Sequence, residues 1–129
     1  MAALLGGQLA SAFVDATGAY PQLKSDKLTV LAITGSQRHP ALPDIPTLGE
    51  AGYKGFEANG WFGAFVPAGT PQPIVDKLGA EVAAIVKSPE VNKRLSDMGL
   101  IPVGSLPGEF KAILERDAAH WKSIVDAAK

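Results

Sequence analysis

The sequence predicts an α/β protein in which a mainly parallel sheet carries helices on its faces. Short apolar segments alternate along the chain with longer segments whose apolar residues recur at helical spacing. The central apolar segment, residues 61–66, begins with two aromatic residues, Trp61 and Phe62, and is followed by Pro67. A continuous apolar run of this length is typical of a strand buried on both faces, and proline stops the ladder because it has no N–H to donate.

The composition suits one domain and excludes several classes of function. The chain has 129 residues, of which 47% are hydrophobic and 19% are charged. Its net charge of −1 gives no electrostatic basis for binding nucleic acid or an anionic membrane. It contains no cysteine, so disulfides and thiolate chemistry are excluded. No apolar run approaches the length that is needed to cross a bilayer.

The first twelve residues contain an Ala-x-Ala pattern that could pass for a signal-peptidase site. They lack the basic start and the continuous apolar centre of a signal peptide. Gly6 and Gly7 instead indicate the end of a helix, so we expect the chain to begin within a helix whose start is missing. Because no export signal is present, the chain expressed as written is expected to stay in the cytoplasm.

The first half is expected to hold two strands, a weak helix and a short capped helix. The strands are predicted at residues 8–14 and at residues 27–33, the second of which is dense in Leu, Val and Ile. The weak helix lies between them and ends at Lys24. After a loop that three prolines keep extended, Thr47 is expected to cap a short helix that Gly52 closes.

The central segment leads directly into a long helix. Thr70 is suited to cap this helix, and Pro71 to occupy its first turn, where the missing N–H is no loss. Apolar residues recur on one side of the helix and are expected to form its buried face. These residues are Ile74, Leu78, Val82 and Ile85, with Val75 and Val86 widening the face.

Two further helices and a brief strand complete the chain. Ser88, followed by a proline and an acid, is expected to cap the first of these helices, and Gly99 is expected to close it. Residues 100–103 are predicted to form an edge strand because they contain a proline. The last helix is expected to begin near Pro107, with Ser105 as the available cap.

Two loops could hold a ligand, because ligands of open α/β sheets bind beyond the carboxyl ends of the strands. Asp15 and Thr17 follow the first predicted strand, and Thr34 and Ser36 follow the second. Hydroxyls and backbone amides at such positions suit a carboxylate. Asp15 would repel a carboxylate, so we expect it to orient its neighbours, hold water or meet an ammonium group. The alternative is that all four residues serve ordinary caps and turns.

The aromatic residues of the central segment complete the candidate site. Two large rings in a strand flanked by glycines suggest a wall against which a ligand packs, and we assign this role to Trp61 and Phe62. The alternative, which composition alone favours, is that both rings pack in the core. A glycine between aromatic residues, Gly63, would then allow a close crossing.

No residue pattern indicates an enzyme. The chain has no Gly-x-Ser-x-Gly, no P-loop and no Gly-x-Gly-x-x-Gly, so neither a serine nucleophile nor a nucleotide cofactor has support. The two histidines, His39 and His120, lie in unrelated contexts without an acid at ligand spacing, so no metal site is expected and surface roles are favoured. We therefore expect a binding protein without a cofactor.

Several segments, in order and in spacing, closely resemble the solute-binding receptors of tripartite tricarboxylate transporters, the TctC or Bug family. These segments are residues 27–34 (Lys-Leu-Thr-Val-Leu-Ala-Ile-Thr), 40–47 (Pro-Ala-Leu-Pro-Asp-Ile-Pro-Thr), 50–53 (Glu-Ala-Gly-Tyr), 61–63 (Trp-Phe-Gly) and 67–71 (Pro-Ala-Gly-Thr-Pro). The likeness covers nearly the whole chain but only the C-terminal part of the longer family members. One departure is Leu106, where the family usually places Thr or Ser before the proline of the last helix.

The resemblance implies part of a type II periplasmic-binding-protein fold, in which two α/β lobes close on a ligand. The chain would be a single fragment: residues 1–55 would end one lobe, and residues 56–129 would supply the crossing strand and the C-terminal part of the other. The resemblance also implies a periplasmic receptor that captures small organic acids, such as di- or tricarboxylates, for the membrane subunits of a transporter.

Two consequences follow if the chain lacks the other part of such a receptor. One side of a cleft would bind organic acids weakly or not at all, and uncovered strand edges would favour a homo-oligomer. The alternative function is accordingly a structural or interaction module that binds no ligand and self-associates.

Overall fold

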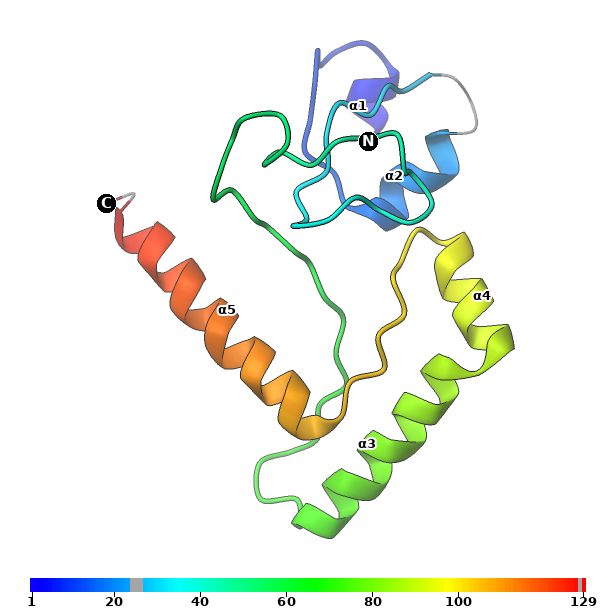
Figure 1. The fold of residues 1–129 in the computed structure, drawn as a ribbon, viewed down its shortest axis with the longest axis vertical. Coiled ribbons are helices and arrows are strands. Elements are labelled where there is room, and N and C mark those ends of the chain that lie inside the picture. The colour runs from blue at the N-terminus through cyan, green and yellow to red at the C-terminus, as the bar shows by residue number, and fades with distance from the viewer. Residues whose placement is uncertain (24–26, 128) are drawn as a thin grey trace. The chain divides into compact units, whose positions relative to one another are not determined.

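The computed structural model describes residues 1–23, 27–127 and 129, and these form five helices joined by turns and extended segments (Figure 1). The helices are α1 (Ala2–Leu5), α2 (Ala16–Leu23), α3 (Gln72–Lys87), α4 (Pro89–Asp97) and α5 (Pro107–Ala127). The chain divides into two compact units. The first unit comprises Met1–Phe62 and Lys93–Ile101, and the second unit comprises Gly63–Asn92 and Pro102–Lys129. The predicted division into two lobes near residue 55 stays a prediction.

The first helix ends where the sequence predicts, and the second begins at Ala16, earlier than predicted. α1 ends at Leu5, and Gly7 behind it has a left-handed φ of 71°, a conformation that glycine adopts without strain. Asp15 caps α2, because its carboxylate accepts a hydrogen bond of 2.8 Å from the backbone N–H of Gly18. The predicted last residue of this helix, Lys24, lies outside the described residues.

α2 packs against the chain that follows α4, and a glycine makes the contact possible. Gly99 closes α4 as predicted, with a left-handed φ of 77°. A Cβ on Gly99 would lie 2.8 Å from the Cβ of Tyr20 in α2. Glycine is therefore required here both by the backbone conformation and by the close approach of the helix.

A parallel β-bridge holds the proline-rich loop of the first unit. The N–H of Ile33 donates to the carbonyl of Pro46, and the N–H of Leu48 donates to the carbonyl of Ile33, both at 2.9 Å. Thr47, the partner in this bridge, is only 5% exposed. The short helix predicted after Thr47 is a single turn, because the chain leaves it at Gly52 with a φ of 102°.

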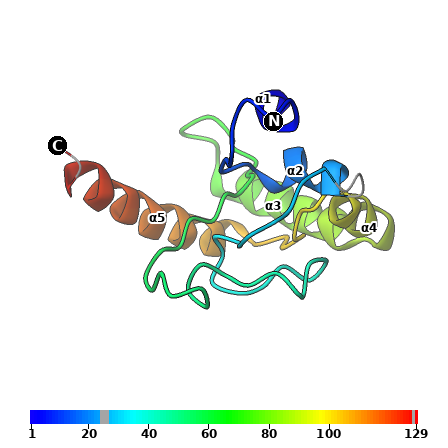
Figure 2. The same cartoon turned by 90° about the horizontal axis from the view of Figure 1, so that it is seen from above.

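The second unit is built on the contact between α3 and α5, which Figure 2 shows from above. A Cβ on Gly79 of α3 would lie 2.5 Å from the Cγ of Pro107, the first residue of α5. One turn further along α3, Ala83 is buried at 6% exposure. Phe110 of α5 covers Gly63 so closely that a Cβ there would lie 2.2 Å from the Cζ of the ring. Small residues therefore allow the helix and the extended segment to approach α5.

The buried side of α3 differs from the predicted one. Its contacts are made by the side that carries Gly79 and Ala83. Of the residues predicted to face the core, Val75 and Val86 are partly buried, whereas the other four form a stripe, which we call the α3 stripe, that is about half exposed. Its members are Ile74 at 50%, Leu78 at 46%, Val82 at 43% and Ile85 at 56%. The prediction was wrong for these four residues because Gly79 and Ala83 are small and let Pro107 approach the helix. Large side chains on that side would keep Pro107 further away.

The predicted caps of the three later helices are also wrong. The hydroxyls of Thr70 and Ser88 donate to the carbonyls of Pro67 and Ile85, at 2.8 and 2.7 Å, and α3 has Pro71 at its N-cap without a side-chain cap. The start of α5 is closed by Glu109 instead of Ser105, because the Glu109 carboxylate accepts a 2.8 Å hydrogen bond from the N–H of Leu106. The carboxylate of an acidic residue in the first turn can accept the N–H of the residue before the helix, so a serine or threonine hydroxyl is not required.

The segments predicted as strands form no ladder within the described residues. These segments are residues 8–14, 27–33, 61–66 and 100–103, and the bridge at Ile33 is the β-pairing that the described part of the chain shows. Several of their large side chains are exposed, as Phe62 at 81%, Phe65 at 67% and Leu31 at 74% illustrate, whereas Leu28, Val30 and Ile33 are partly buried. A strand is stable only when a neighbour pairs with its backbone in a ladder.

Candidate functional site

All six residues predicted to contact a ligand lie in the first unit. They are Asp15, Thr17, Thr34, Ser36, Trp61 and Phe62. They come from the start of α2, from the loop after the β-bridge and from the extended segment that leads to Phe62. No helix of the described residues has both the length and the apolar character needed to span a membrane.

Asp15 and Thr17 form one polar group at the start of α2. The hydroxyl of Thr17 donates to Oδ1 of Asp15, which also accepts the N–H of Gly18 at 2.8 Å. The hydrogen bond from Thr17, followed by the one from the Gly18 backbone, lowers the pKa of Asp15. Asp15 is exposed and ionised at neutral pH. Its carboxylate orients the Thr17 hydroxyl, which agrees with the expectation that Asp15 orients its neighbours.

Thr34 joins its loop to the segment that leads to the aromatic residues. Its hydroxyl donates to the carbonyl of Ala58 at 2.7 Å, and the N–H of Ala58 donates to the carbonyl of Thr34 at 3.1 Å. A Cβ on Gly35 would lie 3.2 Å from Oδ1 of Asn59. Ser36, the next residue of this loop, is exposed. The hydroxyl of Thr34 is thus engaged in the fold, whereas Ser36 lies at the surface.

The two aromatic candidates are exposed. Trp61 is 42% exposed and Phe62 is 81% exposed, so the interpretation of both rings as core residues is wrong for this chain. Just before them, Phe56 stacks on Phe13 with ring centroids 6.3 Å apart. Since Phe13 lies two residues before Asp15, the structure connects both candidate loops to the segment 56–58.

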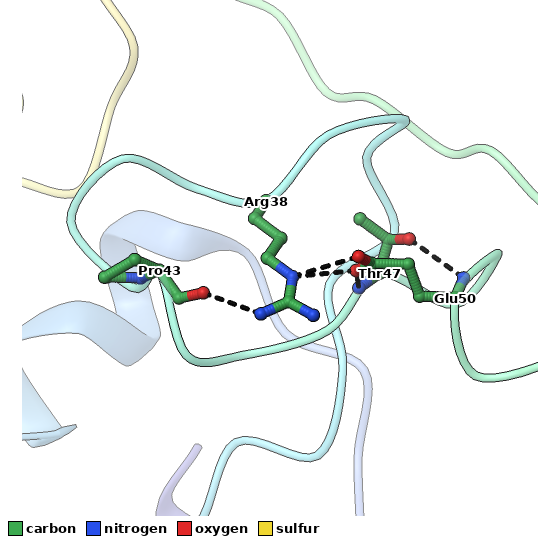
Figure 3. Close-up of polar contacts among 4 residues, drawn as sticks. All are labelled: Arg38, Pro43, Thr47 and Glu50. Atoms are coloured by element: carbon green, nitrogen blue, oxygen red, sulfur yellow. Dashed lines mark hydrogen bonds and ion pairs between the residues drawn. The ribbon is translucent and has the colours of Figure 1, made fainter.

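The sequence analysis missed a polar cluster that fixes the loop beside Thr34 (Figure 3). The Nε of Arg38 lies 2.9 and 3.1 Å from the two carboxylate oxygens of Glu50, and Nη1 donates to the carbonyl of Pro43 at 2.9 Å. Glu50 also accepts the N–H of Thr47 at 2.8 Å, and the Thr47 hydroxyl accepts the N–H of Glu50 at 3.1 Å. Thr47-x-x-Glu50 is a capping box, a spacing that could have revealed the second half of this cluster.

The electrostatics of this cluster follow from the ion pair. Hydrogen bonding by Arg38, and then by the Thr47 backbone, lowers the pKa of Glu50. The same hydrogen bond to Glu50 raises the pKa of Arg38. Both side chains are about half exposed, at 45% and 47%, so water screens the pair. Because Arg38 is already matched by a carboxylate, the cluster fixes the loop rather than offering a free charge.

The histidines are placed in two different environments. Nδ1 of His39 accepts the N–H of Ala41 at 3.1 Å, and its Nε2 is buried, so His39 is less exposed than predicted. His120 is exposed and its ring lies 5.6 Å from that of Trp121, edge to face. Within the described residues, no group of three His, Cys, Asp or Glu side chains is arranged to hold a metal ion.

The family comparison matches the whole chain. The model described as "Tripartite tricarboxylate transporter family receptor" matches residues 1–129. A UPF0065 protein of Agrobacterium vitis is 35% identical over 136 residues, which cover 100% of this chain and 38% of that protein. Protein BugT of Bordetella pertussis is 29% identical, covering 95% of this chain and 37% of that protein. The chain thus spans less than two fifths of the length of these relatives.

Solved structures show the same fold. The periplasmic binding protein BugD is 34% identical with a TM-score of 0.84, and the match covers 99% of this chain and 44% of BugD. MatC from Rhodopseudomonas palustris with bound malate is 34% identical with a TM-score of 0.83, covering 96% and 43%. A protein of R. palustris with adipate gives 30% identity and a TM-score of 0.85, covering 97% and 42%. These likenesses confirm the predicted α/β fold class.

Proposed function

Because the chain belongs to the family of tripartite tricarboxylate transporter receptors, we propose that it takes part in capturing small di- or tricarboxylates in the periplasm and passing them to the membrane subunits of such a transporter. The observation that carries this proposal is the family match over all 129 residues. The solved relatives with malate and adipate support organic acids as the ligand class. The chain acts by binding, without catalysis or a cofactor.

The first unit provides the groups for this capture. The hydroxyl of Ser36 and the backbone amides around it form the part of the site that meets a carboxylate. Thr34 fixes this loop through its bonds with Ala58. Asp15 holds the Thr17 hydroxyl in place, and its negative charge keeps a ligand carboxylate on the side of the Ser36 loop.

The exposed aromatic rings serve the apolar part of the ligand. Trp61 and Phe62 offer flat surfaces that a carbon chain such as that of adipate can cover. Neutral donors beside an apolar wall bind a carboxylate reversibly, as delivery to a transporter requires. Because one side of a cleft supplies only part of the contacts, the isolated chain is expected to bind with a dissociation constant of about 1 mM or weaker.

An NMR titration of the full chain tests the location of the site. Malate added to about 20 mM is expected to shift the amide signals of residues 15–18 and 34–36, with a midpoint of about 1 mM or weaker. Succinamide is the neutral control and should shift them less, because it lacks the carboxylates. Ser36→Ala should reduce the malate shifts, whereas Ser123→Ala, on α5, should not. Malate-dependent shifts that lie elsewhere, or no shifts at all, would refute the proposed site.

The alternative function, a self-associating interaction module, has its own observation. Large side chains stay exposed in the extended segments, including Phe65 at 67%. Soluble monomers seldom leave such patches uncovered. Light scattering over a range of concentrations tests this proposal: a dimer that dissociates on dilution supports self-association, and a monomer at every concentration rejects it.

A further inference from the structure

The loop that carries Ser36, residues 34–37, is held at its first end by backbone pairing. Ile33, the residue before the loop, makes two hydrogen bonds of 2.9 Å with the segment 46–48, one through its N–H and one through its carbonyl. Thr47, in the middle of that segment, is only 5% exposed, so this attachment is shielded from water. The first end of the loop is thus fixed without any charged side chain.

The second end of the loop is held by a side chain (Figure 3). The Nε of Arg38, the residue after the loop, lies 2.9 and 3.1 Å from the two carboxylate oxygens of Glu50, and Nη1 donates to the carbonyl of Pro43 at 2.9 Å. Glu50 also accepts the N–H of Thr47 at 2.8 Å, and its own N–H donates to the Thr47 hydroxyl at 3.1 Å. Both ends of the loop are therefore attached to the turn that Thr47 begins.

We propose that Glu50 is a positioning residue for organic-acid capture, which holds the Ser36 loop, through Arg38, in the conformation that meets a carboxylate. The inference rests on the proposed function, in which the Ser36 hydroxyl and the backbone amides around it bind the ligand. Several amides converge on one carboxylate only while the loop keeps its shape, and a loop that is ordered before binding loses less entropy on binding. Glu50 thus raises the affinity for an anion although its own charge is negative.

A purely electrostatic role for Glu50 predicts the opposite effect. Glu50 neutralises Arg38, which lies two residues after Ser36, so removal of the Glu50 charge should favour an anionic ligand. The positioning role predicts that the same removal disfavours the ligand, because the second end of the loop is released. Glu50→Gln is the suitable variant, since glutamine has nearly the same shape and keeps an oxygen that can accept the N–H of Thr47. The sign of its effect distinguishes the two roles.

Malate titrations of the full chain at pH 7, followed by NMR, measure this effect. In Glu50→Gln, the slope of the amide shifts of residues 34–36 against malate concentration should fall about threefold, which is within the range that a half-exposed ion pair contributes. Asp97→Asn is the matched control, because it also removes one negative charge and an exposed ion pair, the one with Lys93 on α4. Its slope should stay within about 1.5-fold of the parent value.

Two further measurements separate positioning from a general loss of stability. In the ligand-free chain, ¹⁵N relaxation should show that the amides of residues 34–37 are more mobile in Glu50→Gln than in the parent. Gly79→Ala, which loosens the second unit, should keep the parent slope with malate. Arg38→Gln should lower the slope as Glu50→Gln does, and the double variant should lower it no further, because all three lose the same attachment.

The outcomes separate this proposal from the proposed function. An equal or steeper malate slope in Glu50→Gln overturns the positioning role alone, as does unchanged mobility of the loop. A slope that Asp97→Asn or Gly79→Ala lowers as much as Glu50→Gln does also overturns it. The absence of any malate-dependent shift in the parent chain refutes the proposed function itself, and the positioning role with it.

Discussion

Replacing Gly63 by alanine is expected to destabilise the second unit by overpacking. The added Cβ would lie 2.2 and 2.5 Å from Cζ and Cε1 of Phe110, closer than carbon atoms can approach. The ring cannot simply turn away, because it also packs on Phe65 with ring centroids 5.7 Å apart. Either the ring or the extended segment must move.

The magnitude follows from two opposing effects. Inserting a methyl group into a packed contact costs about 1–3 kcal/mol. Replacing glycine by alanine stabilises by about 0.4–1 kcal/mol, because the unfolded chain loses conformational freedom. The net loss is therefore about 1–2 kcal/mol for Gly63→Ala, which lowers the melting temperature by roughly 4 °C per kcal/mol in a chain of this size.

A neighbouring glycine provides the matched control. Gly60 has nothing within 4 Å of its Cβ position and is not among the glycines with positive φ. Gly60→Ala should therefore leave the denaturant midpoint unchanged or raise it slightly. In a Phe110→Ala background, the cost of Gly63→Ala should vanish, because the atoms that it meets are gone. Equal midpoints for Gly63→Ala and the parent chain, or an undiminished cost in the Phe110→Ala background, would refute the reasoning.

Three further predictions concern the loop cluster, the helix contact and self-association. Glu50 has a pKa below its ordinary value of 4.5 in the folded state, so the ion pair with Arg38 stabilises above that pH and the effect is lost as the pH falls through the folded-state value. Denaturant midpoints of the parent chain and Glu50→Gln should thus differ at pH 7 and converge in acid; a constant difference would contradict this. The free energy of unfolding of Gly79→Ala should be lower than that of Gly108→Ala by about 1 kcal/mol or more, because only the Cβ added at position 79 would clash with the ring of Pro107. Equal denaturant midpoints for the two variants would reject the contact. If the exposed side chains drive self-association, the melting temperature should rise with protein concentration between about 1 and 100 μM, and a constant value would indicate a monomer.

Local signals allowed the sequence to predict where the helices lie. The bounds of α3, α4 and α5 follow from apolar periodicity together with prolines at their starts, and Gly99 ends α4 because its backbone conformation suits glycine. The family was also predicted from the sequence, since its motifs occur in order along the chain, and the match over residues 1–129 confirms it. These features depend on neighbours in sequence and need no knowledge of the fold.

The candidate site was predicted only in part. Loops after apolar segments are predictable, and the capping role of Asp15 follows from its place before α2. The bond between Thr34 and Ala58 and the pairing of Arg38 with Glu50 join residues 24 and 12 positions apart. No local pattern determines such pairs, because they depend on how the chain returns on itself. Whether these residues hold an organic acid stays a proposal.

Tertiary structure alone decided which apolar surfaces are covered. Periodicity identified the large residues of the α3 stripe but could not show that the helix packs through Gly79 and Ala83. Likewise, the composition of residues 61–66 predicted a buried strand, and Phe62 is 81% exposed. An amphipathic or apolar segment specifies that its surface favours burial, but burial and strand pairing require a partner. The identity of that partner is a property of the folded assembly and not of the segment.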